Sequence, residues 1–571
     1  MDTHTNAIRR LDSPTARSDS RQLTLSPETS LSLVEIEQLI VALWAELLEI
    51  DKTEVGRHAN FFELGGYSLL ATRATWRIRE IFRVNLPLSD FFEAGNVAQL
   101  AVRIQHCAEP TTATPPLLPQ SHEDFIPASY AQERLWLLDK TTSVGAAYNV
   151  SVAFHLSGAL DVNALERSLT EIARRHDCLR THFGELDGVP YQVVDPPSGF
   201  PLYKADLSIS LDSDERDSQL TSCVQREQLH KFDLSKGPLT RVTLVRLAET
   251  QHVFVMAMHH IVVDGWSLAI LIGELSDLYT AFSQEMPSPL REVSLQYADY
   301  AVWERSWLKD DVLDKEIRYW RARLEGAPAF LDLPTDRPRP REPTYSGSSV
   351  PLELPVALCE AVDTLSRREK VTMFMVFLAA YQVLLSRYTG QKDIVVGAPI
   401  AGRPHEETDG LIGFFVNTLI LRTDLSGTLT VRDLLQRVKE VTLGAYAHQY
   451  LPFDKLVMEL RPERNLGRQP IFQVMIALQN FPKARLELTG LKWTRMSDFT
   501  TTSKFDLILH LFDVSESLFG EQTVQTESSE QLCGAWEYST ELFEQETIER
   551  MSEQFRILLK RAVADPDRLL A

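Results

Sequence analysis

The sequence predicts a multidomain protein in which a small all-α unit precedes a much larger α/β body. Residues 33–107 place apolar side chains at helical spacing in four short stretches. After a proline-rich segment, strand-like and helix-like runs alternate from about residue 125 to the end of the chain. This second body has nearly 450 residues, which is too many for one hydrophobic core, so we expect two lobes.

The small unit is expected to span residues 33–108 and to form a four-helix domain, with helical stretches at residues 33–50, 68–82, 89–93 and 96–107. Residues 1–32 are rich in serine, threonine and charged side chains, which predicts a disordered lead or linker. Residues 109–123 contain four prolines and predict an extended tether of roughly 30 Å.

The larger body is expected to divide into lobes of residues 124–300 and 301–571. Strand-like runs such as YNVSVAFHL, HVFVMAMHH and KDIVVGAPI alternate with helical runs such as VNALERSLTEIARRH. This interleaving is typical of layered α/β or α+β folds.

The composition excludes several classes of function. Of the 571 residues, 44% are hydrophobic and 24% are charged, a balance that predicts folded cores rather than a disordered chain. No run of about 18 apolar residues predicts a membrane span, and a net charge of −21 argues against nucleic acid as a partner. No apolar stretch follows the first arginines, so no secretory signal is predicted. The scattered cysteines form no CxxC pair and suit a reducing cytoplasm: Cys107, Cys178, Cys223, Cys359 and Cys533.

Ser68 follows two glycines and a tyrosine and precedes an amphipathic helical run, in the segment NFFELGGYSLLATR. Gly65 and Gly66 permit a tight turn with little side-chain bulk near the hydroxyl group. Taken alone, Ser68 could be a helix N-cap, although no Glu or Gln three residues later completes a capping box. A nucleophile elbow is excluded because the second glycine of G-x-S-x-G is missing.

The segment FFELGGYSL resembles the phosphopantetheine attachment motif of the peptidyl carrier domains of nonribosomal peptide synthetases. The four helical stretches fit this family from end to end. The resemblance implies that a phosphopantetheinyl transferase attaches a 4′-phosphopantetheine arm at Ser68, and that the arm's thiol holds an aminoacyl or peptidyl thioester. Tyr67 stands where His or Asp is commoner, and Asp is typical of carriers that serve epimerisation domains.

Two histidines, His259 and His260, end the strand-like run HVFVMAMHHIVVDGWS. Neighbouring side chains of a strand face opposite sides, so only one of them can face a given cleft. An extended chain would place His260 and Asp264 about 13 Å apart, so we expect a turn, which Gly265 makes plausible. Taken alone, the spacing favours a packed histidine pair beside a turn aspartate. No metal site is predicted, because HExxH and a third nearby ligand are absent.

The segment MHHIVVDGWS resembles the HHxxxDG signature of the condensation domains of the same synthetases, which are relatives of chloramphenicol acetyltransferase. Six further segments match this family in order: SYAQERLWLL from Ser129, RHDCLRTHF from Arg175, YADYAVW from Tyr297, IGFFVNTLILR from Ile412, HQYLPFD from His448 and RNLGRQPIFQVMI from Arg464. Two of them depart slightly from the usual pattern, with Asp177 in place of Glu and RNLGRQP as a loosened form.

This second resemblance implies a role for each residue of the motif. His260 is the expected catalytic residue, acting either as a base or as a positioner of the attacking amine, while His259 is expected to be structural. Asp264 is expected to act away from the substrate, paired with an arginine of RHDCLRT, with Arg175 ahead of Arg180.

The same resemblance implies that Gly265 admits the substrate arm close to the backbone and that Asn417 faces the channel in support of the site. The implied fold is two chloramphenicol-acetyltransferase-like lobes with the site in a tunnel between them, and segments of the second lobe are expected to cross onto the first. The implied enzyme is an acyltransferase that forms an amide between carrier-bound substrates in secondary metabolism, such as antibiotic or siderophore synthesis. Its implied partners are an adenylation domain, upstream or in trans, and a downstream acceptor carrier; no adenylation or thioesterase segment is recognisable in this chain.

Two rival functions remain open. An epimerisation domain shares HHxxxDG, but GFFVNTLILR and HQYLPFD are condensation-type and no EGHGRE-like segment occurs. A non-catalytic domain that only docks carriers or recruits partners could retain the same motifs. A heterocyclisation domain is excluded because it would replace the histidines with paired aspartates.

Overall fold

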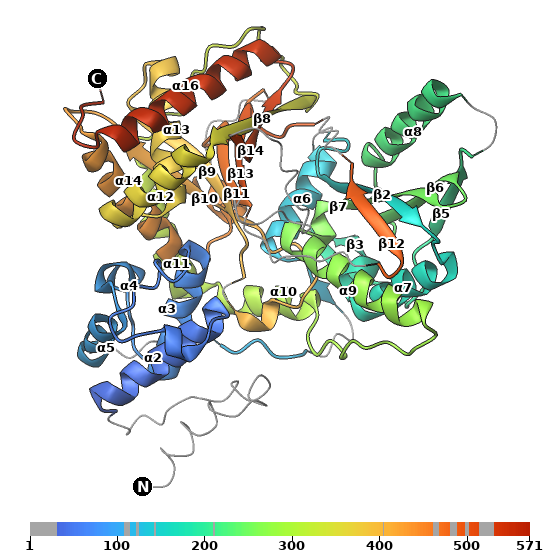
Figure 1. Cartoon of the computed structure of the whole chain (residues 1–571), viewed down its shortest axis with the longest axis horizontal. Coiled ribbons are helices and arrows are strands. Elements are labelled where there is room, and N and C mark those ends of the chain that lie inside the picture. Colours follow the sequence, from blue (N-terminus) through green and yellow to red (C-terminus); the bar gives the residue numbers. More distant parts are fainter. Residues whose placement is uncertain are drawn as a thin grey trace. The chain divides into compact units, whose positions relative to one another are not determined.

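The computed structural model describes residues 31–107, 115–120, 125–141, 144–208, 212–403, 405–460, 467–479, 488–496, 502–512 and 530–570 (Figure 1). Its contacts divide the chain into two compact units. One comprises Met1–Pro115, Ala361–Phe377 and Arg432–Ala447, and the other comprises Pro116–Glu360, Leu378–Val431 and His448–Ala571. Almost all of the predicted lead at residues 1–32 and most of the predicted tether at residues 109–123 lie outside the described residues.

The first unit contains the four helices that the sequence predicts. Its helices are α2 (Leu33–Leu48), α3 (Ser68–Phe82), α4 (Leu88–Ala94) and α5 (Val97–His106), with a 3-10 turn η3 (Lys52–Glu54). Helix α2 packs against α3 and α5, and α4 also packs against both of these. Parts of α12 (Val356–Glu369), α13 (Met373–Thr389) and α14 (Val431–Ala447) group with this unit.

Aromatic packing sets the start of α3. The ring of Phe61 lies 5.1 Å from those of both Trp44 and Phe91, forming the centre of the small core. The chain then turns so closely over Phe61 that a Cβ on Gly66 would lie 2.3 Å from its ring, and Gly65 adopts a φ of +98°. The two glycines are therefore required to bring the chain round to the first residue of α3.

The second unit contains a five-stranded sheet in the order β12-β2-β7-β6-β5. Its described strands are β2 (Asn149–Gly158), β5 (Leu202–Asp206), β6 (Thr240–Ala248), β7 (Gln251–His259) and β12 (Leu491–Arg495). Strand β12 comes from the predicted second lobe and pairs antiparallel with β2 of the first, which confirms the expected crossover.

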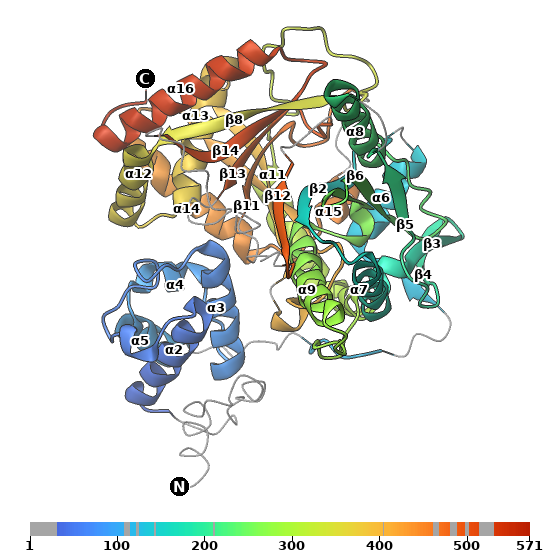
Figure 2. The same ribbon diagram turned by 45° about the vertical axis from the view of Figure 1, so that its right-hand side comes forward.

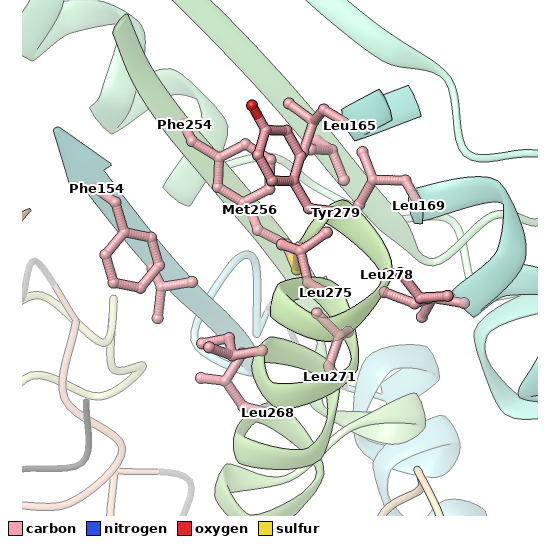
Figure 3. Close-up of a cluster of buried hydrophobic side chains, with 14 of the residues drawn as sticks. Phe154, Leu165, Leu169, Phe254, Met256, Leu268, Leu271, Leu275, Leu278 and Tyr279 are labelled. Carbon is pink, nitrogen blue, oxygen red and sulfur yellow. The ribbon is translucent and has the colours of Figure 1, made fainter. Parts of the chain in front are cut away.

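Helices cover both faces of this sheet because its central strands are apolar on both sides. Helices α7 (Val162–Arg175) and α9 (Gly265–Ser283) lie side by side on one face (Figure 2). The buried leucines of α9 pack there against Phe254 and Met256 of β7 (Figure 3). Helix α8 (Ser213–Gln228) packs on the opposite face.

A smaller sheet in the order β1-β4-β3 lies in the same unit, formed by β1 (Ile126–Pro127), β3 (Thr181–Leu186) and β4 (Val189–Val194). Leu117, within the predicted tether, is buried in the adjoining core, and the Gln120 N–H donates a hydrogen bond to Asp299 (2.8 Å). Leu117 and Gln120, near the end of the predicted tether, therefore pack against the larger body.

The remaining strands form a six-stranded sheet in the order β10-β9-β11-β13-β14-β8. Its members are β8 (Gly347–Pro355), β9 (Asp393–Ile400), β10 (Asn417–Asp424), β11 (Val474–Gln479), β13 (Leu507–Phe512) and β14 (Glu530–Ser539). Trp536 of β14 packs against Tyr381 of α13 and Phe555 of α16 (Gln545–Ala564), which places these helices on one face (Figure 1). This layered arrangement confirms the α/β class.

Shorter elements complete the second unit: α6 (Tyr130–Thr141), η4 (Asp177–Arg180), η5 (His260–Val262), α10 (Tyr297–Trp307), α11 (Asp310–Leu324), η6 (Glu406–Thr408) and α15 (Phe453–Leu460).

Among the described helices, none alone is long and apolar enough to cross a membrane, although α12 and α13 together pass that test as a pair bent by 104°.

Candidate functional site

Strand β7, a central strand of its sheet, leads into the two histidines at its C-terminal end. It is buried along most of its length and ends at His259, after which His260–Val262 form a 3-10 turn and Asp264 caps the N-terminus of α9. The turn that the sequence predicts is therefore present. It arises because the strand must reverse into α9, which packs back onto the same sheet.

The imidazole of His260 is fixed by its Nδ1 atom, which lies 2.7 Å from the carbonyl oxygen of Val263. A carbonyl can only accept, so Nδ1 carries the hydrogen, and a neutral ring then has its lone pair on Nε2. The backbone N–H of His260 donates to the carbonyl of Tyr148 (2.7 Å), and the Phe414 ring lies 4.9 Å from the imidazole. The side chain of His260 is partly exposed.

The imidazole of His259 has the opposite arrangement. It is buried, and its Nδ1 accepts a hydrogen bond from the backbone N–H of Ile261 (3.2 Å). A neutral ring with Nδ1 as acceptor carries its hydrogen on Nε2. The two neighbouring histidines thus differ in exposure and in tautomer.

Burial lowers the pKa of both imidazoles to about 3. Lys504 adds to this effect on each histidine, and its Nζ lies 4.8 Å from the centre of the Tyr148 ring. Burial also lowers the pKa of Lys504 itself. Because ordinary histidine titrates near 6.5, both rings are neutral at physiological pH.

Asp264 is held inside the protein by Arg403, and both side chains are 0% exposed. The Arg403 guanidinium lies 3.4 Å from Asp264 Oδ1, which also accepts the N–H of Ser267 (2.7 Å). The Phe415 N–H donates to Asp264 Oδ2 (3.0 Å). The carboxylate therefore joins the start of α9 to the segment that precedes β10.

The predicted pairing of Asp264 with Arg175 or Arg180 is wrong. Arg175 bonds instead to Glu274, at 3.0 and 3.2 Å, and Arg180 pairs with Asp177. Glu274 lies ten residues beyond Asp264, which is about 15 Å along α9. Arg175, at the end of the neighbouring helix α7, meets α9 at that distance from Asp264.

Residues 411–415 lie directly beside the histidine motif. Ser267 Oγ donates to the Gly413 carbonyl (2.9 Å) and accepts the Gly413 N–H (3.0 Å). Tyr297 donates its hydroxyl hydrogen to the Phe414 carbonyl (2.6 Å) and lies 2.8 Å from Ser129 Oγ. Three of the segments quoted from the sequence, those beginning at Ser129, Tyr297 and Ile412, thus meet beside His260.

Asn417 is held by backbone groups of the segment that leads into α15. Asn417 donates through Nδ2 to the carbonyls of Gln449 and Leu451 (both 2.8 Å) and accepts the Phe453 N–H. Its amide is therefore occupied by backbone groups, and that Asn417 faces the channel stays a prediction. Gly265 is the first residue of α9.

The segments around Ser129 and His448 also meet, through an ion pair between Arg134 and Asp454 (2.6 Å). Burial raises the pKa of Asp454 to about 6.

Arg464, which begins the last quoted segment, lies outside the described residues. No group of three or more His, Cys, Asp and Glu side chains in the described part of the chain could hold a metal ion.

A substitution at Gly413 tests how closely this segment is packed. A Cβ there would lie 1.9 Å from the Tyr297 ring, so Gly413→Ala is expected to lower the free energy of unfolding by about 1–3 kcal/mol, measured by denaturant titration. Gly410→Ala is the matched control, because a Cβ at Gly410 meets nothing within 4 Å. Equal stability of the two variants would contradict the packing described.

In the first unit, α3 begins at Ser68, and its N-cap is Tyr67 in an extended conformation without a side-chain cap bond. The interpretation of Ser68 as the N-cap is therefore wrong by one residue. The first hydrogen bond of the helix joins the Ala71 N–H to the Tyr67 carbonyl (2.9 Å). The first turn of a helix presents backbone N–H groups and a positive dipole end, which suit a phosphate ester on its first residue. Position 68 thus fits a phosphopantetheine group.

Comparison with known families identifies both parts. Residues 38–104 match the family described as phosphopantetheine attachment site, and residues 122–571 match the condensation domain. One of the linear gramicidin synthase proteins of Brevibacillus parabrevis is 44% identical over 94% of this chain, which covers 10% of that protein. Malpinin synthetase of Mortierella alpina is 39% identical over 94% of this chain, which covers 7% of it. The chain thus spans about a tenth or less of the length of these relatives.

Solved structures show the same fold. The X-domain from teicoplanin biosynthesis superposes with a TM-score of 0.71 at 27% identity, over 80% of this chain and 99% of that one. The first condensation domain of the CDA synthetase superposes with a TM-score of 0.63 at 21% identity, over 79% and 98%. The chain belongs to the condensation-domain family of nonribosomal peptide synthetases and carries a phosphopantetheine carrier domain ahead of its condensation domain.

Proposed function

We propose that the carrier domain presents a donor aminoacyl or peptidyl thioester on a phosphopantetheine arm at Ser68, and that the condensation domain transfers it to the amine of a second carrier-bound aminoacyl group. The observation that carries this proposal is the state of His260. Its ring is neutral, its Nδ1 is bonded to Val263, and its lone pair is on Nε2 of a partly exposed side chain.

In this reaction the amine nitrogen forms a bond to the thioester carbonyl carbon and the C–S bond breaks. The proton lost by the amine ends on the departing sulfur, which leaves as the free thiol of the donor arm. His260 accepts a hydrogen bond from the amine through Nε2 and orients its lone pair. A ring with a pKa of about 3 is a weak base, so positioning of an already neutral amine is favoured over removal of a proton from an ammonium group.

The other residues act through structure. Asp264 and Arg403 hold the start of α9 against residues 411–415, and His259 fills the buried side of the strand end. Gly265, which carries no side chain at the first position of α9, leaves the backbone accessible to the substrate arm. Asn417 braces the segment that leads into α15.

Membership of this family implies that the chain works with adenylation and carrier domains of a synthetase. We further propose acyltransferase chemistry, attachment of the arm by a phosphopantetheinyl transferase, and a location in the cytoplasm. The similar synthetases are named for linear gramicidin and malpinin, which supports a peptide product.

Ser68→Ala tests the attachment site. Incubation with coenzyme A and a phosphopantetheinyl transferase is expected to add one arm to the wild-type chain and none to the variant, as measured by intact-protein mass. Ser89, on α4 in the same domain, supplies the control Ser89→Ala, which should accept one arm. Peptide mapping that finds the arm on another serine would overturn the assignment.

The full reaction is tested by incubating the donor-loaded chain with an acceptor carrier and analysing the acceptor by mass spectrometry. Transfer of the donor onto the acceptor amine is expected. Inversion of the donor α-carbon without transfer would identify an epimerisation domain instead.

A docking or recruiting domain is the second candidate, because one similar structure is that of an X-domain in complex with another protein of teicoplanin biosynthesis. If the chain catalyses neither transfer nor inversion but still binds a partner protein, a docking or recruiting domain is favoured. The neutral His260 and its fixed tautomer support amide formation over this alternative.

A further inference from the structure

We infer that Phe414 is a positioning residue for the amide-forming reaction, holding the imidazole of His260 in the orientation that presents Nε2 to the amine. The inference rests on the proposed function. The two rings meet edge to face, with centroids 4.9 Å apart and planes inclined by 60°. Edge-to-face contacts between rings are favoured over other arrangements, so this contact favours one orientation of the imidazole.

The backbone on each side of Phe414 is anchored to the start of α9. Ser267 Oγ holds both the N–H and the carbonyl of Gly413, at 3.0 and 2.9 Å. The Phe415 N–H donates to Asp264 Oδ2 (3.0 Å). Residues on both sides of Phe414 are thus fixed to the helix that immediately follows the His260 turn.

A third bond fixes Phe414 itself. The Tyr297 hydroxyl donates to the Phe414 carbonyl at 2.6 Å, and that hydroxyl in turn lies 2.8 Å from Ser129 Oγ. Because a hydroxyl has one hydrogen, Ser129 supplies the donor in this second bond. The backbone of Phe414 is therefore fixed by hydrogen bonds on both sides, and its ring packs at the border of the core that contains Tyr297 and Phe415.

Phe414 and its neighbour Phe415 adjoin the same core but differ in exposure. Phe415 is buried, with the Arg403 guanidinium 3.9 Å from its ring, whereas Phe414 is partly exposed and turned toward His260. Truncation of Phe414 should therefore cost less stability than truncation of Phe415. In the truncated variant, the hydrogen bond to the Val263 carbonyl still holds the His260 ring, but the ring can tilt about that bond.

The test uses the full chain with a loaded donor and a soluble aminoacyl thioester as variable acceptor. Phe414→Ala is expected to lower kcat about 10- to 100-fold, since small misplacements of a reacting group have effects of this size, with acceptor KM changed less than about threefold. Phe414→Tyr keeps the ring and should restore most of kcat. Phe125→Ala is the matched control: this half-exposed ring contacts Tyr191 on the small sheet, and its loss should leave kcat unchanged.

A double-mutant comparison separates action through His260 from any other effect. In a His260→Ala background, Phe414→Ala should cause no further loss of kcat, because the group it positions is gone. A wild-type kcat in Phe414→Ala, or the same fold-loss in both backgrounds, would overturn the inference.

A chemical probe makes the outcome independent of turnover. Diethyl pyrocarbonate acylates neutral imidazoles, and its rate at His260, read by peptide mass mapping, should rise several-fold in Phe414→Ala and stay near wild type in Phe414→Tyr. His182, paired with Asp195 on the small sheet, serves as the internal reference. If the wild-type chain forms no amide, the proposed function fails, but the acylation rate still decides whether Phe414 restrains His260. An unchanged acylation rate in Phe414→Ala would contradict the inference.

Discussion

Replacement of His260 by alanine is expected to leave loading of the carrier intact and to slow amide formation by about 100-fold, the effect typical of losing the position of a reacting group. The carrier domain has its own core around Phe61, so attachment and loading at Ser68 are expected to proceed without His260. Single-turnover transfer from the loaded chain to an acceptor carrier measures the effect.

His260→Asn distinguishes the two roles that the sequence leaves open. An amide oxygen can accept a hydrogen bond from a neutral amine but cannot take a proton from an ammonium group. If positioning dominates, the asparagine variant should recover part of the activity that alanine loses. If it is no better than alanine, a simple accepting role is contradicted.

The pH dependence gives an independent check. Burial holds the pKa of His260 at about 3, below its ordinary 6.5, so the ring stays neutral throughout pH 6 to 9. The rise in rate with pH in that range should therefore come from the acceptor ammonium losing its proton, with an apparent pKa near 8 that follows the acceptor used. An inflection near 6.5 that does not move with the acceptor would contradict the neutral ring. His182→Ala, a histidine of the small sheet, should leave the profile unchanged.

Breaking the ion pair between Asp264 and Arg403 is expected to be the most destabilising single change in the condensation domain. Both side chains are fully buried, and removing one leaves the other charge without its partner, which costs about 3–5 kcal/mol. Asp264→Asn retains a side chain able to cap α9, so its loss of stability reports mainly on the charge. Denaturant unfolding of Asp264→Asn and Arg403→Met measures the effect.

The double variant identifies the partner. Asp264→Asn with Arg403→Met should cost clearly less than the sum of the single changes, because each has already broken the same pair. Arg175→Met is also expected to destabilise the protein, through loss of its bonds to Glu274, but additively with Asp264→Asn. Coupling of Asp264 to Arg175 in place of Arg403 would contradict the structure.

A surface arginine supplies the control. Arg174, adjacent to Arg175, pairs with Glu171 and Glu292 while 43% exposed. Solvent-exposed ion pairs contribute at most about 1 kcal/mol, so Arg174→Met should change stability little. A loss as large as that of Arg403→Met would show that burial is not what makes the Asp264 pair important.

The sequence by itself was sufficient for the features that depend on neighbours along the chain. Helical spacing predicts the carrier helices, two glycines predict the turn before Ser68, and a buried strand ending in histidines predicts the position of His260. The need for a turn between His260 and Asp264 also follows from local geometry, since an extended chain would separate them. These features are set by hydrogen bonds and side-chain periodicity within about ten residues.

Features that join distant segments were decided only by the tertiary structure. The partner of Asp264 is Arg403, 139 residues further along the chain. Arg175 of α7 cannot take this place, because it contacts α9 at Glu274, about 15 Å beyond Asp264. Asn417 stands in a recognisable motif, yet its amide is consumed by backbone groups of residues 449–453 that no spacing rule brings there. Likewise Phe414 and Lys504 lie near the histidines only because segments far apart in the sequence pack together at the end of β7. Buried charges and polar groups need partners, and the tertiary structure determines which residues supply them.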